Sequence, residues 1–545
     1  MSPGSSLRAT LVAILIPGLT FAPGLATTGA AQDLPRTRPE RTAYAETSRY
    51  ADVMAFLDSL RLVDPGLDVR ALGYSEEGRS LPLAVFGAEP GATAAEIRAD
   101  RRLRVLVLAN IHAGEVAGKE AALVLARELV EGRRDDWLDS VIVLIAPIYN
   151  ADGNERIGLR NRPGQFGPLA GMGQRPNARG LDLNRDNMKL DAAEGRALAR
   201  ALQELDPDVL VDLHTTNGTK HAYHLTYAPP LHPDTDPGIV DELRSQWLPW
   251  VTRTVRERSG WEFFHYGNIP GTWGMKGEQG WYTFDHRPRF TTNYVGIRNR
   301  FGILSEAYSY ASFEERILAH GLFVEALLDY ASQHAGRLRA IVNRADARPV
   351  TGTEIALSAE LQRGDTITIL MGEVREERNP YSGQRMLVRG EAKVPERVPD
   401  YTTFRSSLAT TVPAAYLVPA TEAETIERLR AHGIHTRSLG TAARLEVEVF
   451  TADSVQTSER EYQRRSPTTL FGSWTTVTRE LPAETVVVPT DQPLGRLAAL
   501  LLEPRSDDGL AAWSILEVGE DRVFPVVRTD RVPSNLLKGT VIGVR

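Results

Sequence analysis

The strongest constraint on the fold is an alternation, between residues 103 and 213, of nearly continuous apolar segments with segments of helical periodicity. The apolar segments are Leu103 to Leu108, Val141 to Ile148 and Val209 to Leu213, and the helical ones are Val116 to Val130 and Asp191 to Leu205. Strands that are apolar along their whole length are buried on both faces. We therefore predict an α/β fold whose mixed, mostly parallel sheet is covered by helices on both faces.

The sequence on either side of this alternation extends the predicted architecture. Upstream, Tyr50 to Leu62 has helical spacing, and Val69 to Gly73 with Leu81 to Val85 predicts a hairpin. Beyond about residue 340, alternating segments predict strands, with one helix at Thr421 to His432. A chain of 545 residues is too long for one core. We expect an α/β domain at 42–335, large enough to hold an active site, and a β-rich C-terminal domain of unknown role at 345–545.

The first 31 residues have the pattern of an export signal. Arg8 precedes an apolar stretch, Leu11 to Ala26, that contains Pro17 and Pro23 and is followed by small residues. This stretch is too short and too broken to span a bilayer, so we predict a signal peptide and a secreted or periplasmic protein without stable membrane insertion. The alternative is a disordered or anchored N-terminus.

Charge and cysteine content limit the function further. The net charge is −7 and no basic stripe is present, which argues against a nucleic-acid partner. The chain has no cysteine, which excludes disulfides, thiolate catalysis and cysteine-ligated zinc. Any metal must therefore be held by histidine and carboxylate.

His112 and Glu115 are the first candidates for such a site. His112 is the only one of eleven histidines that is followed three residues later by a glutamate, and it comes directly after a predicted buried strand. His214 ends another such strand. Three ligands with an open fourth position are typical of catalytic zinc. Two simpler interpretations stay open, because a glutamate at a helix start complements the dipole and a lone histidine at a strand end is usually packed.

The segment between these residues carries a family resemblance. Tyr149-Asn150-Ala-Asp152-Gly-Asn154 and the later Gly180-Leu-Asp-Leu-Asn184-Arg-Asp186 lie in order between the His-x-x-Glu pair and His214. In this combination the motifs resemble those of the zinc carboxypeptidases, the carboxypeptidase A-like metallocarboxypeptidases, over roughly residues 42–335.

The resemblance implies a role for each matching residue. His112, Glu115 and His214 match the ligands of one Zn²⁺ per chain, and Asp182 matches a carboxylate that orients a ligating imidazole. Asn184 and Arg185 match the pair that binds the substrate's terminal carboxylate. Arg175 matches the arginine that stabilises the oxyanion, with Arg179 as its competitor. Glu306 matches the general base, although an outward-facing strand residue is the alternative interpretation.

The sequence departs from the family pattern at several positions. Ala151 replaces a usual proline, and Asp186 replaces a frequent asparagine. The family's mobile tyrosine has no clear counterpart: Tyr282 and Tyr294 are both candidates, and Arg298 is a further candidate for anion binding. The tryptophans between residues 247 and 281 fit either a second small core or a wall of the substrate cleft.

These observations lead to one expected function and two alternatives. We expect an exported zinc metallocarboxypeptidase that hydrolyses the C-terminal amide bond of peptides with a free terminal carboxylate, through a zinc-activated water. The same site also fits a cell-wall peptide amidase or an N-acyl amino acid deacylase. An alternative of another class is a catalytically silent protein that binds peptides or glycans.

Overall fold

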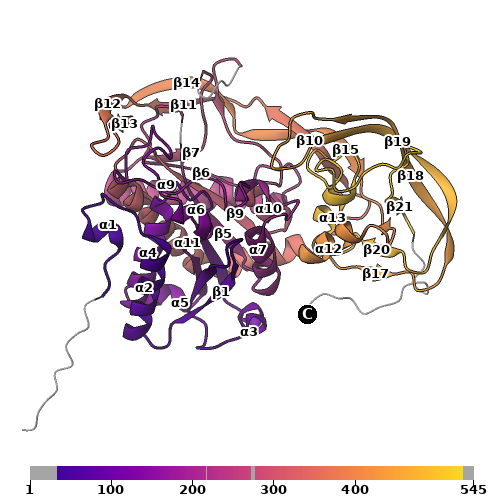
Figure 1. Ribbon diagram of the computed structural model, residues 1–545, viewed down its shortest axis with the longest axis horizontal. Helices are drawn as coiled ribbons and strands as arrows, with labels where there is room; N and C mark the ends of the chain where they lie inside the picture. The colour runs from indigo at the N-terminus through magenta and orange to yellow at the C-terminus, as the bar shows by residue number, and fades with distance from the viewer. Residues whose placement is uncertain (1–33, 217, 272–276, 532–545) are drawn as a thin grey trace, which may run out of the picture.

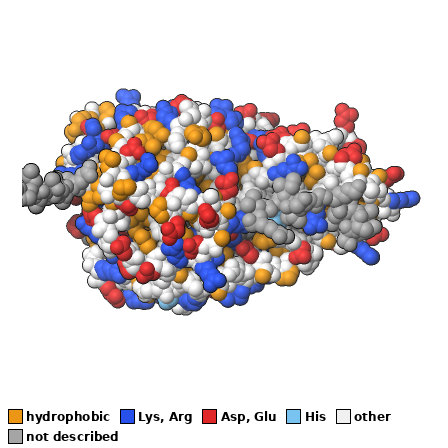
Figure 2. Space-filling view, turned by 90° about the horizontal axis from the view of Figure 1, so that it is seen from below, with side chains coloured by type: hydrophobic (Ala, Val, Ile, Leu, Met, Phe, Trp, Pro, Cys, Tyr) orange, Lys and Arg blue, Asp and Glu red, His pale blue; other side chains and the backbone are white. Residues whose placement is uncertain are grey.

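The computed structural model describes residues 34–216, 218–271 and 277–531, so the predicted signal peptide at 1–31 lies outside the described residues. A sheet with its helices forms one half of the molecule, and a β-rich part forms the other (Figure 1). Acidic and basic side chains are interspersed over the face seen in Figure 2. Within the described ranges, no helix is long and apolar enough to cross a membrane.

The N-terminal half contains the predicted mixed sheet. Its strand order is β1-β2-β4-β3-β5-β9-β6-β7, and β4, β3, β5 and β9 pair in parallel in its centre. β1, β2 and β4 are joined by antiparallel pairing, as β9 and β6 are. The strand bounds are β1 Asp68–Tyr74, β2 Ser80–Phe86, β3 Leu103–Ala109, β4 Val141–Ala146, β5 Val209–Thr215, β6 Leu225–Ala228, β7 Phe263–His265 and β9 Phe301–Ala307.

Helices cover both faces of this sheet (Figure 1). Every residue of β3, β4 and β5 is buried, as their apolar sequences predict. The longest helix, α11, begins at a capping box in which Ser312 and Glu315 bond each other's backbone, and it packs against α4 and α9. The helices of this half are α1 Arg38–Arg41, α2 Tyr50–Val63, α3 Ala94–Ala99, α4 Ala117–Val130, α5 Asp135–Leu138, α6 Ala151–Glu155, α7 Ala193–Glu204, α8 Pro237–Glu242, α9 Leu248–Ser259, α10 Thr291–Ile297 and α11 Phe313–Ala347, with a 3-10 turn η1 Leu183–Arg185 and a π turn η2 Leu243–Trp247.

The C-terminal part is built mostly of strands. Its largest sheet has the order β17-β20-β16-β21-β18-β19, in which β18 and β19 form a long hairpin. The elements are β10 Glu354–Gln362, β11 Thr366–Met371, β12 Val374–Arg378, β13 Arg385–Arg389, β14 Val394–Tyr401, β15 Thr403–Thr411, β16 Ala415–Val418, α12 Ala423–Ala431, β17 Arg437–Ser438, β18 Ala443–Thr457, β19 Thr468–Leu481, β20 Val486–Pro489, α13 Gly495–Leu502 and β21 Val527–Thr529.

The C-terminal part also contacts the N-terminal half of the molecule. β14 pairs in parallel with the short strand β8 (Trp281–Tyr282), and Trp281 packs in a small core with Ile369 and Val398. Trp247 packs on Tyr330 and Phe301 in the main core. Both tryptophans therefore serve packing, which is one of the two roles expected for this segment.

Candidate active site

The predicted metal ligands lie at the carboxyl ends of adjacent parallel strands. His112 lies in the loop between β3 and α4, and His214 is the last residue but one of β5. Glu306 of β9 is the direct partner of His214 in the parallel register. Ligands of open α/β sheets bind at this end of the strands. The topology thus brings residues that are far apart in the sequence to one point.

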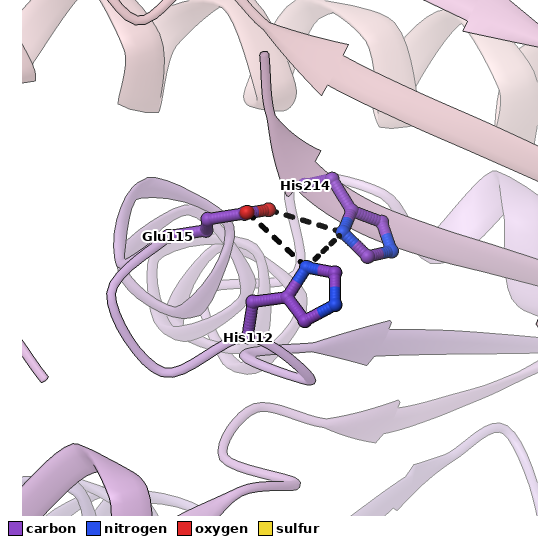
Figure 3. Close-up of side chains that lie close together, drawn as sticks. All are labelled: His112, Glu115 and His214. Atoms are coloured by element: carbon purple, nitrogen blue, oxygen red, sulfur yellow. Dashed lines mark hydrogen bonds and ion pairs between the residues drawn. The ribbon is translucent and has the colours of Figure 1, made fainter. Parts of the chain in front are cut away.

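His112, Glu115 and His214 form a compact cluster (Figure 3). The Nδ1 atom of His112 lies 3.1 Å from Glu115 Oε1, and the Nδ1 atom of His214 lies 3.0 Å from Glu115 Oε2. The two Nδ1 atoms are 3.1 Å apart. The donor atoms all lie within 4.8 Å of one another, a spacing at which they can hold a metal ion.

The outer nitrogens of both imidazoles face carboxylates. Asp182 Oδ1 lies 3.1 Å from Nε2 of His112, and Asp212 Oδ2 lies 2.9 Å from Nε2 of His214. The hydrogen bond to Asp182 keeps the proton of His112 on its outer nitrogen and leaves the inner nitrogen free to bind a metal. Asp212 contacts the outer nitrogen of His214 as an ion pair, and its oxygens have no hydrogen bond among the described residues. The donor set and its outer partners therefore fit zinc.

Glu115 is held in its ionised form. Burial raises its pKa, but His112 and Arg162 outweigh this effect and hold the pKa well below its usual range. Nη1 of Arg162 donates to Oε1 at 2.7 Å, and the backbone N–H of Thr215 donates to Oε2 at 2.9 Å. These bonds fix the carboxylate where it faces both histidines.

Glu306 lies in the same cavity as the cluster. Its Oε2 atom is buried and has no hydrogen-bond partner in the described parts of the chain. Burial raises its pKa to about 8, with a further contribution from Glu115 that His214 opposes. A divalent cation at the cluster would lower this pKa again. The side chain therefore lies inside the cavity, and the alternative of an outward-facing strand residue is wrong.

The two candidate oxyanion arginines lie in different places. Arg175 lines the cavity, donates from Nε to Asp182 at 2.9 Å, and has Nη1 3.6 Å from Glu115. Arg179 instead donates to the backbone oxygen of Asp191 at 2.9 Å. It is absent from the described lining of the cavity, which leaves Arg175 as the better placed of the two.

Asn184 and Arg185 both line the cavity. The side-chain oxygen of Asn184 accepts from the backbone N–H of Thr291 at 2.8 Å, so only its amide NH₂ faces the cluster, 3.5 Å from His214 Nε2. The Arg185 guanidinium lies 3.8 Å from the ring centre of Phe290. In the described structure its Nε and Nη1 atoms are hydrogen-bonded, whereas Nη2 is not.

The two departures from the family motifs are accommodated locally. Ala151 opens the short helix α6, where Asn150 caps the turn and donates to the backbone oxygens of Ile111 and Arg175 at 3.2 Å. Asn150 thus links the His112 loop to the Arg175 loop without a proline. The buried carboxylate of Asp186 bonds to Lys189 and to two backbone N–H groups.

The cavity has a volume of about 250 Å³ and both polar and aromatic walls. Its remaining lining residues include Thr215, Thr216, Tyr266, Phe284, Phe290, Thr292 and Leu304. Tyr282 instead stacks on Tyr401. The hydroxyl of Tyr294 bonds to His432, and Arg298 donates to the backbone oxygen of His432. Tyr282, Tyr294 and Arg298 therefore lie outside the described cavity lining.

Comparison with known proteins agrees with this geometry. A family model described as zinc carboxypeptidase matches residues 53–204, which include His112, Glu115, Asn184 and Arg185. The chain carries a zinc carboxypeptidase domain. Carboxypeptidase 2 of Trichophyton rubrum is 22% identical over 478 residues, covering 83% of this chain and 81% of that protein. The chain is thus a zinc-dependent metallocarboxypeptidase, a hydrolase.

Two further similarities are narrower. Carboxypeptidase D of Rattus norvegicus is 36% identical over 144 residues, covering 22% of this chain and 10% of that protein. The second is to the crystal structure of a metallo-carboxypeptidase from Burkholderia cenocepacia, with 18% sequence identity and a TM-score of 0.40. The matched region covers 54% of the present chain and 71% of the Burkholderia chain.

Proposed function

We propose that this metallocarboxypeptidase is exported and removes the C-terminal residue of peptides that end in a free carboxylate. The observation that carries the proposal is that one cavity is lined by His112, Glu115, His214, Glu306 and Arg185 together. Hydrolysis of an amide bond next to a terminal carboxylate needs a metal site, a general base and a cation that binds the carboxylate. The histidines with Glu115, then Glu306, then Arg185 would supply these three parts in one cavity.

His112, Glu115 and His214 would hold one zinc ion. Zinc in such a donor set lowers the pKa of a coordinated water and polarises a carbonyl. Asp182 and Asp212 keep both imidazoles oriented, and Arg162 keeps the Glu115 carboxylate in place. The metal site is then rigid before substrate arrives, which is the state that electrostatic stabilisation of a transition state requires.

Arg185 and Asn184 would bind the terminal carboxylate of the substrate. Nη2 of Arg185 is the hydrogen-bond donor that remains available, and the amide NH₂ of Asn184 is a second one. A charge-assisted bond to a carboxylate is stronger than a neutral one, so a free acid binds better than an amide. Phe284 and Phe290 provide an apolar wall for the departing side chain.

Glu306 would act as the general base and then as the acid. Its burial favours the proton-bound form, so it can take a proton from the attacking water and later give it to the leaving nitrogen. The Arg175 guanidinium, which lies beside Asp182 and Glu115, would stabilise negative charge on the carbonyl oxygen.

Two assignments outside the site belong to the same proposal. Residues 1–31 would be the export signal and place the protein in the periplasm or outside the cell. Residues 42–335 would be the catalytic domain, and residues 345–545 a separate β-rich domain.

A mixed peptide library with mass-spectrometric readout tests the reaction type. We expect the zinc-loaded protein to release single C-terminal residues from free acids and not from the matching amides. Arg185→Met should remove most of this preference. Equal rates on free and amidated peptides in the parent would contradict the proposal, and cleavage restricted to muropeptides or N-acyl amino acids would assign the site to amidase or deacylase chemistry.

A further inference from the structure

The hairpin of β18 and β19 ends in a tight turn formed by Tyr462, Gln463, Arg464 and Arg465, here named the 462–465 turn. Tyr462 and Arg465 exchange backbone hydrogen bonds of 2.8 and 3.2 Å. The two central residues, Gln463 and Arg464, have φ angles of 54° and 63°. Turns of this kind favour Asn and Gly, so long side chains here cost backbone energy and need compensating contacts.

The contacts of this turn lie on the catalytic half. The Oε1 atom of Gln463 accepts a hydrogen bond of 2.8 Å from the backbone N–H of Asp182, the residue that orients His112. The hydroxyl of Tyr462 accepts a bond of 3.1 Å from Nε of Arg185. The turn therefore contacts the backbone of Asp182, whose carboxylate faces His112, and the side chain of the carboxylate-binding arginine.

A half-buried ion pair anchors the turn in this position. Arg465 donates to Asp191 from both Nε and Nη2 at 2.7 Å. Burial raises the pKa of Asp191, but Arg465 and Lys189 outweigh this effect and hold the pKa well below its usual range. Two parallel charge-assisted bonds fix distance and orientation together.

Aromatic packing fixes the Tyr462 ring as well. The ring stacks on Trp513 with centroids 6.0 Å apart and an interplanar angle of 17°. The guanidinium of Arg289 lies 4.5 Å from the Trp513 ring and pairs with the buried Asp508 at 2.8 Å. The Tyr462 ring is thus held by Trp513 of the β-rich part and by Arg289, which lies in the turn before α10.

We propose that the 462–465 turn is a positioning element of the carboxylate-binding site, so that the β-rich part helps to set the affinity for substrates with a free C-terminus. Phe290 lies against one face of the Arg185 guanidinium, the backbone oxygen of Asn184 accepts from Nη1, and Tyr462 accepts from Nε. These contacts occupy Nε and Nη1 and leave Nη2 without a hydrogen bond among the described residues, on a side chain that lines the cavity. This inference rests on the proposed function of Arg185.

Two variants and one control test the inference on the full chain. Tyr462→Phe removes only the hydroxyl. Gln463→Gly removes the contact to Asp182 while relieving the left-handed backbone, so it should fold at least as stably as the parent. Tyr381→Phe is the matched control, because Tyr381 is an exposed tyrosine of the same β-rich part.

We expect Tyr462→Phe to raise KM for free-acid peptides by about three- to tenfold, with kcat within about twofold, because its hydrogen bond to the charged Arg185 is lost at a partly exposed site. Gln463→Gly loses a hydrogen bond to an uncharged backbone N–H, so we expect a smaller rise in KM of about two- to fivefold, also with kcat within about twofold. Calorimetric titration with 3-phenylpropanoate should show the same loss of affinity, in zinc-loaded and in metal-free protein. The neutral 3-phenylpropanamide should bind parent and variants equally.

The outcomes separate the inference from the proposed function. Unchanged KM and unchanged 3-phenylpropanoate affinity in both variants would overturn the positioning role, and so would a loss of kcat or of zinc content at unchanged KM. A parent that binds 3-phenylpropanoate but releases no C-terminal residue would instead refute the proposed function, while the titrations would still test the turn.

Discussion

Replacing Asp182 with asparagine should weaken zinc binding without removing a ligand. Asp182 Oδ1 accepts from Nε2 of His112 at 3.1 Å, in a site where the two side chains are 11% and 4% exposed. The carboxylate keeps the imidazole proton on Nε2. An asparagine can present its NH₂ to Nε2 instead, which moves the proton to Nδ1, the nitrogen that faces Glu115.

The size of the effect follows from this burial. Partners of ligating histidines typically contribute 10- to 100-fold in metal affinity, which is about 1.4 to 2.7 kcal/mol. Because water reaches the bond poorly, we expect a loss of about 30- to 100-fold for Asp182→Asn. Arg175 adds little to this loss, because its side chain is 39% exposed and water can replace its bond to Asp182.

Competition for zinc against a chromophoric chelator measures this loss directly. Asp212→Asn should weaken binding in the same direction, because Asp212 faces Nε2 of His214. Asp241→Asn, at an exposed position, should bind zinc as the parent does. If Asp182→Asn and Asp212→Asn both keep zinc affinities within twofold of the parent, the metal is not held by these two histidines in the orientation described.

Two further predictions concern stability. Burial raises the pKa of Asp285, but Arg287 outweighs this and lowers it to about 2, so the stabilisation is complete above about pH 4 and is lost as the pH falls from about 4 towards 2. In Asp285→Asn, the free energy of unfolding measured with urea should therefore change less with pH between about pH 4 and pH 2 than it does in the parent. An equal pH dependence in both proteins would contradict the ion pair of Asp285 with Arg287 as its source. A chelator should lower the thermal midpoint of the parent, zinc should restore it in a concentration-dependent way, and His112→Ala should respond to neither; an equal response of this variant would place the metal elsewhere.

The central sheet could be predicted from sequence because its strands are buried on both faces. β3 and β5 were expected as apolar runs, and both are buried along their whole length. The sequence placed the start of α4 one residue early, at Val116, where the structure has the N-cap. Glu115 is therefore in the turn before the helix, where its backbone N–H donates to the His112 oxygen at 2.8 Å.

The site was predictable only where its residues carry a local motif. His112 and Glu115 stand three residues apart, and the order of motifs towards His214 carries the family resemblance. Arg162 contacts Glu115 from a loop with no motif of its own. Tyr462 forms a hydrogen bond with Arg185, from which it is separated by 277 positions in the sequence. Such contacts depend on how the β-rich part packs, which neither periodicity nor spacing encodes.

For some other residues, the sequence pattern indicates that a polar group needs a partner but does not identify the partner. Asp212 is a carboxylate within an otherwise apolar strand, two residues before His214, and a buried charge of this kind needs a partner. Tyr294 and Arg298 lie in a polar segment that resembles a site, yet they bond to His432 of the β-rich part. Sequence alone does not distinguish a contact between two parts of a chain from a contact with substrate.

The central claim is that Glu306 moves the proton at a zinc site formed by other residues, and the variant Glu306→Gln tests it most directly. Zinc content per chain and peptide hydrolysis should be measured on the same preparation, with Glu257→Gln, an exposed glutamate of α9, as the control. We predict that Glu306→Gln binds one zinc per chain as the parent does and loses at least about 10²-fold of its turnover. Turnover at the parental rate with zinc retained would contradict the account.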